Sequence, residues 1–87
     1  MRNQRQTSVR RAILRVLSLM PEGIVIPDRL LRADAQRLVL PPAPTTAELD
    51  AEIQEADTAR LIVSVNGEDD VQRQITDAGR AWLARNP

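Results

Sequence analysis

The 87-residue chain contains no cysteine and no histidine. The absence of cysteine excludes disulfides and thiol chemistry, and the two absences together exclude the usual zinc ligand sets. Without histidine, the commonest general base of enzymes is missing as well. The composition therefore directs attention toward binding and away from catalysis.

Aromatic side chains and lysine are also scarce. Trp82 is the only aromatic residue, so the core must be aliphatic, and the chain has no row of rings on which single-stranded nucleic acid could stack. There is no lysine, so all twelve basic residues are arginine, and twelve acidic residues balance them. A net charge of zero gives the whole chain no overall attraction to a phosphate backbone.

Long apolar runs are missing. No segment approaches the roughly 20 apolar residues of a membrane-spanning helix, and the N-terminus lacks the apolar centre of a secretory signal peptide. We therefore expect a cytoplasmic protein. A chain of 87 residues is expected to form one small domain with a modest core.

What the chain does contain is a regular order of helix and strand patterns. Residues 1–7 are polar and basic and predict a flexible arm, ahead of a single domain over residues 8–85. Thr7 or Ser8 is expected to cap a first helix, which the proline and glycine of residues 21–23 bring to an end. Its inner face is predicted from apolar residues at helical spacing. These are Val9, Ile13, Val16, Leu17 and Met20.

A short strand and a second helix are expected next. Residues 24–26 form a β-branched run that predicts the strand. Pro27 suits the start of the second helix, and helical spacing puts Leu31, Ala35 and Leu38 on one face of it.

The middle of the chain predicts a rigid spacer and a third helix. Three prolines within residues 41–44 prevent helix formation there. Thr45 and Glu48 then have the spacing of a capping box, in which each side chain bonds the other residue's main chain. The third helix is expected to begin at this box and to end near Ala59.

The last third of the chain is its most informative part. Alternating residues predict strands over 61–65 and 71–75, and Asn66-Gly67 is a strong turn signal because both residues tolerate positive φ. Thr76 is expected to cap a closing helix, and Trp82 is expected to pack that helix onto the core. The pattern predicts strand, turn, strand and a capped helix.

This order of elements resembles the winged-helix superfamily over roughly residues 8–84. The most specific piece is Ile75-Thr76-Asp77-Ala78-Gly79-Arg80-Ala81-Trp82-Leu83, which is similar to the passage that closes the wing in many bacterial members. The resemblance implies a small α+β domain with three helices, a short strand, a β-hairpin wing and a C-terminal helix. It also implies a third helix that enters the major groove of DNA and a wing that touches the backbone.

The charges on those two elements argue against that use. No basic residue occurs between Arg37 and Arg60, and the wing adds Glu68, Asp69 and Asp70. Carboxylates facing phosphates are repelled. On the third helix, the polar residues expected to be exposed are Glu48, Asp50, Glu52, Gln54, Glu55 and Asp57.

The first functional hypothesis is therefore a non-catalytic module for protein–protein interaction. Its acidic third helix and wing would bind a protein partner with a basic surface, or a second copy of the chain. The small size suits a phage-encoded or accessory bacterial protein. The candidate partner-binding residues are Glu48, Glu52, Glu55, Asp69 and Asp70.

The alternative hypothesis is a small DNA-binding transcriptional regulator that uses arginines of the arm and first helix. A solvated basic helix face is the simpler interpretation of the same residues, and pairing of one copy's first helix with another copy's third helix is a further one. The candidate nucleic-acid-binding residues are Arg2, Arg5, Arg10, Arg11 and Arg15.

Enzymatic activity is not expected. Glu48, Glu52 and Glu55 are spaced to share a helix face, but acid–base catalysis requires a pocket that separates their pKa values. There is no calcium-binding loop of the EF-hand type, no glycine-rich phosphate loop, and no histidine partner for any serine. We therefore expect no catalytic residues, no metal site and no cofactor.

Overall fold

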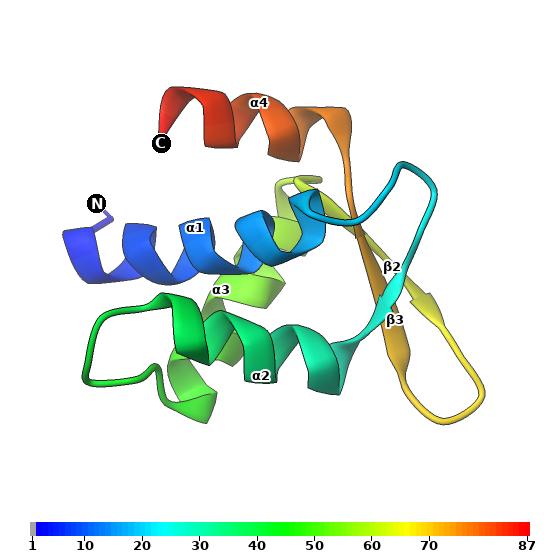
Figure 1. Ribbon diagram of the computed structural model, residues 1–87, viewed down its shortest axis with the longest axis horizontal. Helices are drawn as coiled ribbons and strands as arrows, with labels where there is room; N and C mark the ends of the chain where they lie inside the picture. Colours follow the sequence, from blue (N-terminus) through cyan, green and yellow to red (C-terminus); the bar gives the residue numbers. More distant parts are fainter. Residues whose placement is uncertain (1) are drawn as a thin grey trace.

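The computed structural model describes residues 2–87 and shows an α+β domain with a winged-helix-like arrangement. Three antiparallel strands in the order β1-β3-β2 form the sheet. Figure 1 shows this sheet at one end of the molecule, with α1 running between α4 and α2. The predicted fold class is confirmed. The elements are α1 (Gln4–Ser18), β1 (Ile26–Pro27), α2 (Asp28–Leu38), α3 (Thr46–Thr58), β2 (Ile62–Asn66), β3 (Val71–Ile75) and α4 (Asp77–Arg85).

Helix α1 begins earlier than predicted. Asn3, not Thr7 or Ser8, is its N-cap: the Asn3 side chain accepts a hydrogen bond from the main-chain N–H of Gln6, and the Gln6 side chain accepts one from the N–H of Asn3. This reciprocal pair satisfies two main-chain donors that would otherwise lack partners. Residues 4–7 are therefore helical, and the prediction of a flexible arm over them is wrong. Met1 lies outside the described residues.

The core is aliphatic, as the shortage of aromatic residues predicts. Helix α1 contributes more buried residues to it than any other element. Two residues expected on inner faces lie elsewhere: Met20 follows the end of α1 and is half-buried, and Leu38, in the last turn of α2, is 51% exposed. The largest fully buried side chains of the core are Val9, Ile13, Leu14, Leu31, Leu49 and Ile62.

The wing is formed by β2, β3 and the turn between them. Ile62 pairs with Ile75 at one end of the hairpin and both are buried, whereas Val63 and Val65 face outward and are exposed. The turn does not use the positive φ expected at Asn66-Gly67, since within residues 2–87 only Gly23 and Arg60 have positive φ. Instead, the N–H of Gly67 donates to the carbonyl of Asp70, and an added Cβ at Gly67 would lie 2.6 Å from that oxygen.

Helix α4 closes the domain as predicted. The Thr76 hydroxyl accepts from the N–H of Gly79 and donates to the carbonyl of Arg60. Gly79 lies so close to the preceding segment that an added Cβ would be 2.2 Å from the carbonyl oxygen of Leu61. Trp82 is partly buried and packs against the core, as predicted. Within residues 2–87, the helices are too short or too polar to cross a lipid bilayer.

Candidate functional site

Helix α3 carries the acidic residues on which the first hypothesis depends. The predicted capping box is present: Glu48 donates its main-chain N–H to the Thr45 hydroxyl, and the Glu48 carboxylate accepts from the N–H of Thr45. The helix that starts here places Glu48, Glu52 and Glu55 along one side. That side faces α1 and the residues just before it, as the following contacts show.

Three arginines from the start of the chain bind these three glutamates. Arg5 makes two bonds to Glu48, from Nε at 2.8 Å and from Nη2 at 3.1 Å. Arg2 bridges two carboxylates, with Nη2 at 2.6 Å from Oε1 of Glu52 and Nη1 at 2.7 Å from Oε2 of Glu55. A forked guanidinium suits this bridging geometry better than an ammonium group does.

Arg10 completes this cluster and extends it to α4. Its Nη2 lies 3.1 Å from Glu55 and its Nε lies 3.3 Å from Glu52, although Nε has no partner with hydrogen-bond geometry. The Cζ atom of Arg10 is 5.8 Å from the centre of the Trp82 ring, within the range of a cation–π contact. Glu52, with 4% of its side chain exposed, is the most buried member.

The ion pairs hold Glu48 in its ionised form. The hydrogen bonds from Arg5, followed by the main-chain bond from Thr45, lower the pKa of Glu48 from 4.5 to about 2. The same side-chain bond raises the pKa of Arg5. Both groups therefore remain charged across the physiological pH range.

The prediction that the acidic residues of α3 and the wing are free to bind a partner is wrong for most of the candidates. Glu52 is buried, while Glu48 and Glu55 are held by arginines, because α1 packs over this side of α3. Asp70 is also engaged, since its carboxylate accepts from the main-chain N–H groups of Val71 and Arg29. Among the five candidates, Asp69 alone makes no side-chain bond within residues 2–87.

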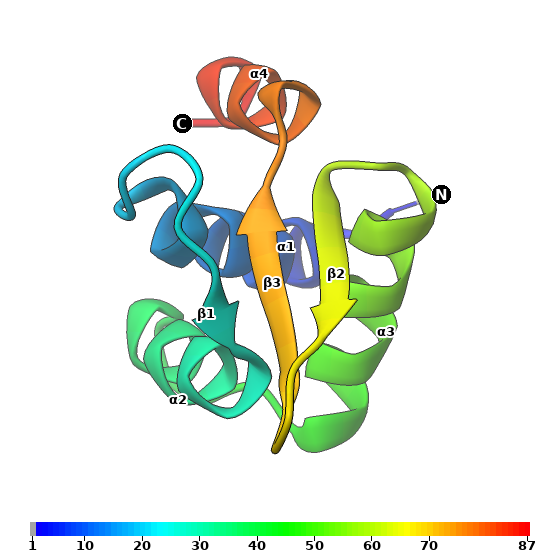
Figure 2. The same ribbon diagram turned by 90° about the vertical axis from the view of Figure 1, so that its right-hand side faces the viewer.

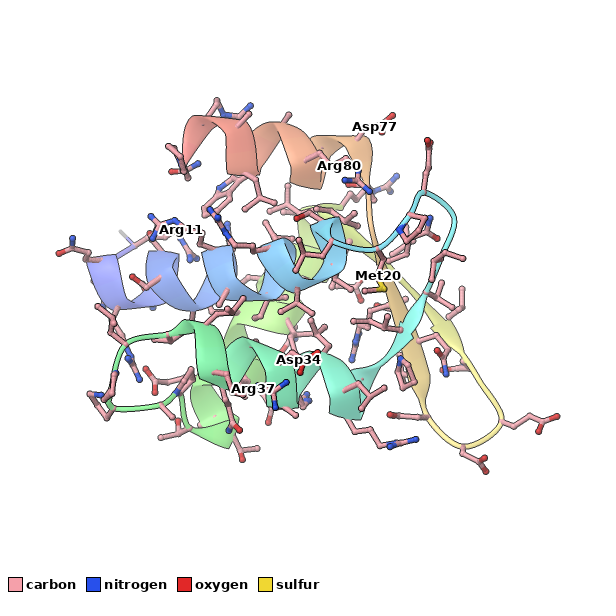
Figure 3. All side chains as sticks on the ribbon, in the orientation of Figure 1. Arg11, Met20, Asp34, Arg37, Asp77 and Arg80 are labelled. Atoms are coloured by element: carbon pink, nitrogen blue, oxygen red, sulfur yellow. The ribbon has the colours of Figure 1, made fainter. Side chains whose placement is uncertain are left out.

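The candidate nucleic-acid footprint is reduced by the same pairing. Arg2, Arg5 and Arg10 are taken up by the glutamates. Arg11 donates from Nε to the main-chain carbonyl of Asn86 at 2.9 Å, and Figure 3 shows it between α1 and α4. Arg15 is exposed and forms no ion pair with any residue from 2 to 87. Of these five candidates, only Arg11 and Arg15 have no carboxylate partner within residues 2–87.

A second charged network was missed by the sequence reasoning. Asp28 accepts from Nε of Arg32 at 2.6 Å and from Nε of Arg73 at 3.0 Å, and Arg32 also contacts Asp50 at 2.6 Å. Burial lowers the pKa of Arg32, but the bonds to Asp28 and Asp50 outweigh it and raise that pKa overall. The network joins α2, β3 and α3. Only the Asp28–Arg32 spacing of four residues is a local signal that sequence alone could offer.

The exposed residues of α3 are uncharged or acidic. Figure 2 shows that the start of α3 and the turn between β2 and β3 lie on the same lower side of the molecule, and Figure 1 shows them apart along its longest axis. We define the α3–wing surface as the exposed residues of these two segments. They are Thr46, Ala47, Asp50, Glu68 and Asp69.

Within residues 2–87, no group of three or more acidic side chains is placed to hold a metal ion. Comparisons of the chain with protein-family models, with curated proteins and with solved structures found no match. Membership of the winged-helix superfamily therefore stays a prediction, carried by the order of the elements and by the Ile75–Leu83 passage.

Proposed function

We propose that this chain is a non-catalytic protein-binding module and that it binds its partner through the α3–wing surface. The observation that carries the proposal is the pair of exposed carboxylates at the wing turn, Glu68 and Asp69, which form no ion pair within residues 2–87. Arg2, Arg5 and Arg10 are bound to the glutamates of α3, while Glu68 and Asp69 stay exposed on the wing. A partner that fits this surface is a protein with a basic patch, because complementary charge favours encounter and register.

The state of Glu48 supports a binding role over acid–base catalysis. A general acid or base works best when its pKa lies near the working pH. The pKa of Glu48 is instead lowered to about 2 by Arg5 and Thr45. Its side chain therefore acts as a fixed structural anion.

The DNA-binding alternative has a direct test. We would titrate a fluorescein-labelled duplex of random sequence with the protein at low salt and follow the fluorescence anisotropy. We expect no increase up to about 100 µM protein, a concentration at which nonspecific DNA binders are bound. An increase that disappears steeply with added salt would favour the regulator hypothesis, with Arg11 and Arg15 as the first residues to substitute.

The protein-binding proposal is tested by capture from a bacterial extract. Glu68→Arg/Asp69→Arg changes two exposed wing residues that make no ion pair within residues 2–87. The matched control is Asp57→Arg, which changes an exposed acid near the other end of α3. We expect the wild type and the control to capture the same protein and the wing variant to lose it. Equal capture by all three proteins would refute the role of the wing.

A further inference from the structure

Two adjoining hollows run along the outer side of α1. One, of about 420 Å³, lies between α1 and residues 38–40, and the other, of about 530 Å³, lies between the end of α1 and α4. They share Arg15 and Leu38, and no acidic residue lines either one. We call this continuous feature the α1–α4 groove. Its basic lining residues are Arg5, Arg11, Arg15 and Arg80.

Most of the positive charge in the α1–α4 groove is not neutralised. Arg5 is paired with Glu48, but Arg15 has no ion pair within residues 2–87. Arg11 and Arg80 donate to main-chain carbonyls, of Asn86 and Ser18 respectively, which carry no net charge. Figure 3 shows Arg80 pointing from α4 toward the end of α1. The groove therefore favours an acidic ligand.

The same groove is apolar between its arginines. Leu40 is 85% exposed, Leu19 is 72% exposed and Leu38 is 51% exposed, and all three line it. Large apolar side chains that cluster on a surface commonly mark an interaction site. A ligand that satisfies the whole groove must combine carboxylates with apolar side chains.

The wing of the same protein has this combination. Glu68 and Asp69 are exposed at its turn, and Val63 and Val65 are exposed on the outward side of its first strand. In Figure 1 the wing turn lies far from the N-terminal half of α1 and from residues 38–40. A wing therefore cannot enter its own groove, but it can reach the groove of another copy.

We propose that the wing of one copy docks in the α1–α4 groove of a second copy. The proposal rests on the proposed function and deepens it by naming the partner of the wing. Carboxylates of Glu68 and Asp69 meet the arginines, while Val63 and Val65 cover the exposed leucines. The contact joins two different surfaces, so each added copy still presents a free wing and a free groove, and the assembly grows head to tail or closes into a ring.

The test uses two variants that each remove one half of the contact. Arg15→Glu/Leu40→Ser disables the groove and keeps the wing, whereas Glu68→Arg/Asp69→Arg disables the wing and keeps the groove. Arg15, Leu40, Glu68 and Asp69 are all exposed, so both variants are expected to fold, and circular dichroism checks this. Sedimentation velocity at low salt measures the assembly of each protein alone and of an equimolar mixture.

We expect the wild type to form assemblies that grow with concentration and weaken with salt. Each variant alone is expected to associate at least about tenfold more weakly, because like charges then face one another. The mixture is expected to recover association, because the unchanged wing of the groove variant can dock in the unchanged groove of the wing variant. Two controls, Arg85→Glu and Asp57→Arg, change exposed charges outside the two surfaces and should behave as the wild type.

Two results would overturn the inference. One is a wild type that sediments as a monomer at every concentration tested, and the other is a pair of folded variants that fail to restore a complex on mixing. If the wild type is monomeric and the wing variant still loses capture of another protein, the inference fails and the proposed function stands. If the wing variant changes neither measurement, both fail.

Discussion

At the scale of single residues, Arg10 links three parts of the molecule. It extends from α1, lies between the carboxylates of Glu52 and Glu55, and faces the ring of Trp82 on α4. Burying such ions is unfavourable unless their partners are in place. We infer that the cluster selects one orientation of α1 against α3, because any other orientation leaves buried charges unpaired.

The first prediction compares two glutamates of this cluster. Glu52→Gln removes the buried charge shared by Arg2 and Arg10, and we expect the free energy of unfolding to fall by about 2–4 kcal/mol. Glu55→Gln is the control, because the Glu55 side chain is 57% exposed and is expected to lose less than about 1 kcal/mol. Urea denaturation measures both. Equal losses would contradict the unequal burial of the two residues.

The second prediction concerns pH and Glu48. Its pKa is about 2 in the folded protein and 4.5 ordinarily, so the unfolded chain binds the proton more tightly. The stability from this group is complete above pH 4.5 and is lost as the pH falls toward 2. We therefore expect Glu48→Gln to be less stable than the wild type at pH 6, with a difference that shrinks on acidification. A difference that stays constant down to the lowest pH would refute this origin.

At the scale of elements, the close approach of α4 to the segment that follows α3 depends on glycine, which has no side chain, at position 79. Gly79 is buried in the first turn of α4, and the space that its Cβ would fill is occupied by the Leu61 carbonyl and the Ile75 side chain. Helix α4 therefore lies closer to the Leu61 carbonyl than a residue with a side chain at position 79 would allow. The Thr76 cap fixes the start of the helix at this point.

The third prediction is a reversal of the usual helix preference at Gly79. In an exposed helix interior, replacing glycine with alanine stabilises by about 0.5–1 kcal/mol. For Gly79→Ala we instead expect a loss of about 1–3 kcal/mol from overpacking, because the added Cβ would be 2.2 Å from a carbonyl oxygen. Thermal unfolding against the wild type measures the sign. A stabilised variant would mean that the close contact relaxes easily.

Local signals in the sequence predicted most of the helices and strands. They could not predict contacts between residues that are far apart in the sequence. The capping box at Thr45 and Glu48 and the cap at Thr76 are properties of a few adjacent residues, and both are confirmed. Asn3 and Gln6 offered the same kind of signal, but the basic composition around them suggested an arm instead. The early start of α1 therefore could have been predicted.

The pairing of α1 with α3 could not have been predicted in the same way. Glu48 is 43 residues from Arg5, and Glu52 is 50 residues from Arg2. Spacing within each helix shows that complementary charges exist, but it does not tell whether they meet in one chain or between two. That question depends on how the helices cross, which is set by packing of the aliphatic core.

At the scale of the whole molecule, a net charge of zero conceals an uneven distribution of charge. The ion pairs between α1 and α3 neutralise the middle of the domain. Exposed carboxylates of Glu68 and Asp69 remain at the wing, and exposed arginines remain along the α1–α4 groove. This separation is the basis of both proposals, because it leaves two surfaces of opposite sign on one small domain.

The fourth prediction concerns cooperativity. Trp82 packs against the common core and contacts Arg10, so α4 is expected to unfold together with the rest of the domain. Because Trp82 is the only aromatic residue, its fluorescence reports on the packing of α4 against the core. We expect the thermal transitions from fluorescence and from far-ultraviolet circular dichroism to coincide. A fluorescence transition at lower temperature would indicate that α4 detaches first.

The exposure of Leu40 has a practical consequence for spectroscopy. The side chain is 85% exposed and lies outside the core, in a protein without cysteine. A Leu40→Cys substitution would thus place a unique thiol for a spin label or dye at the rim of the groove. Distances between labels on neighbouring molecules could then be followed in solution without disturbing the folded interior.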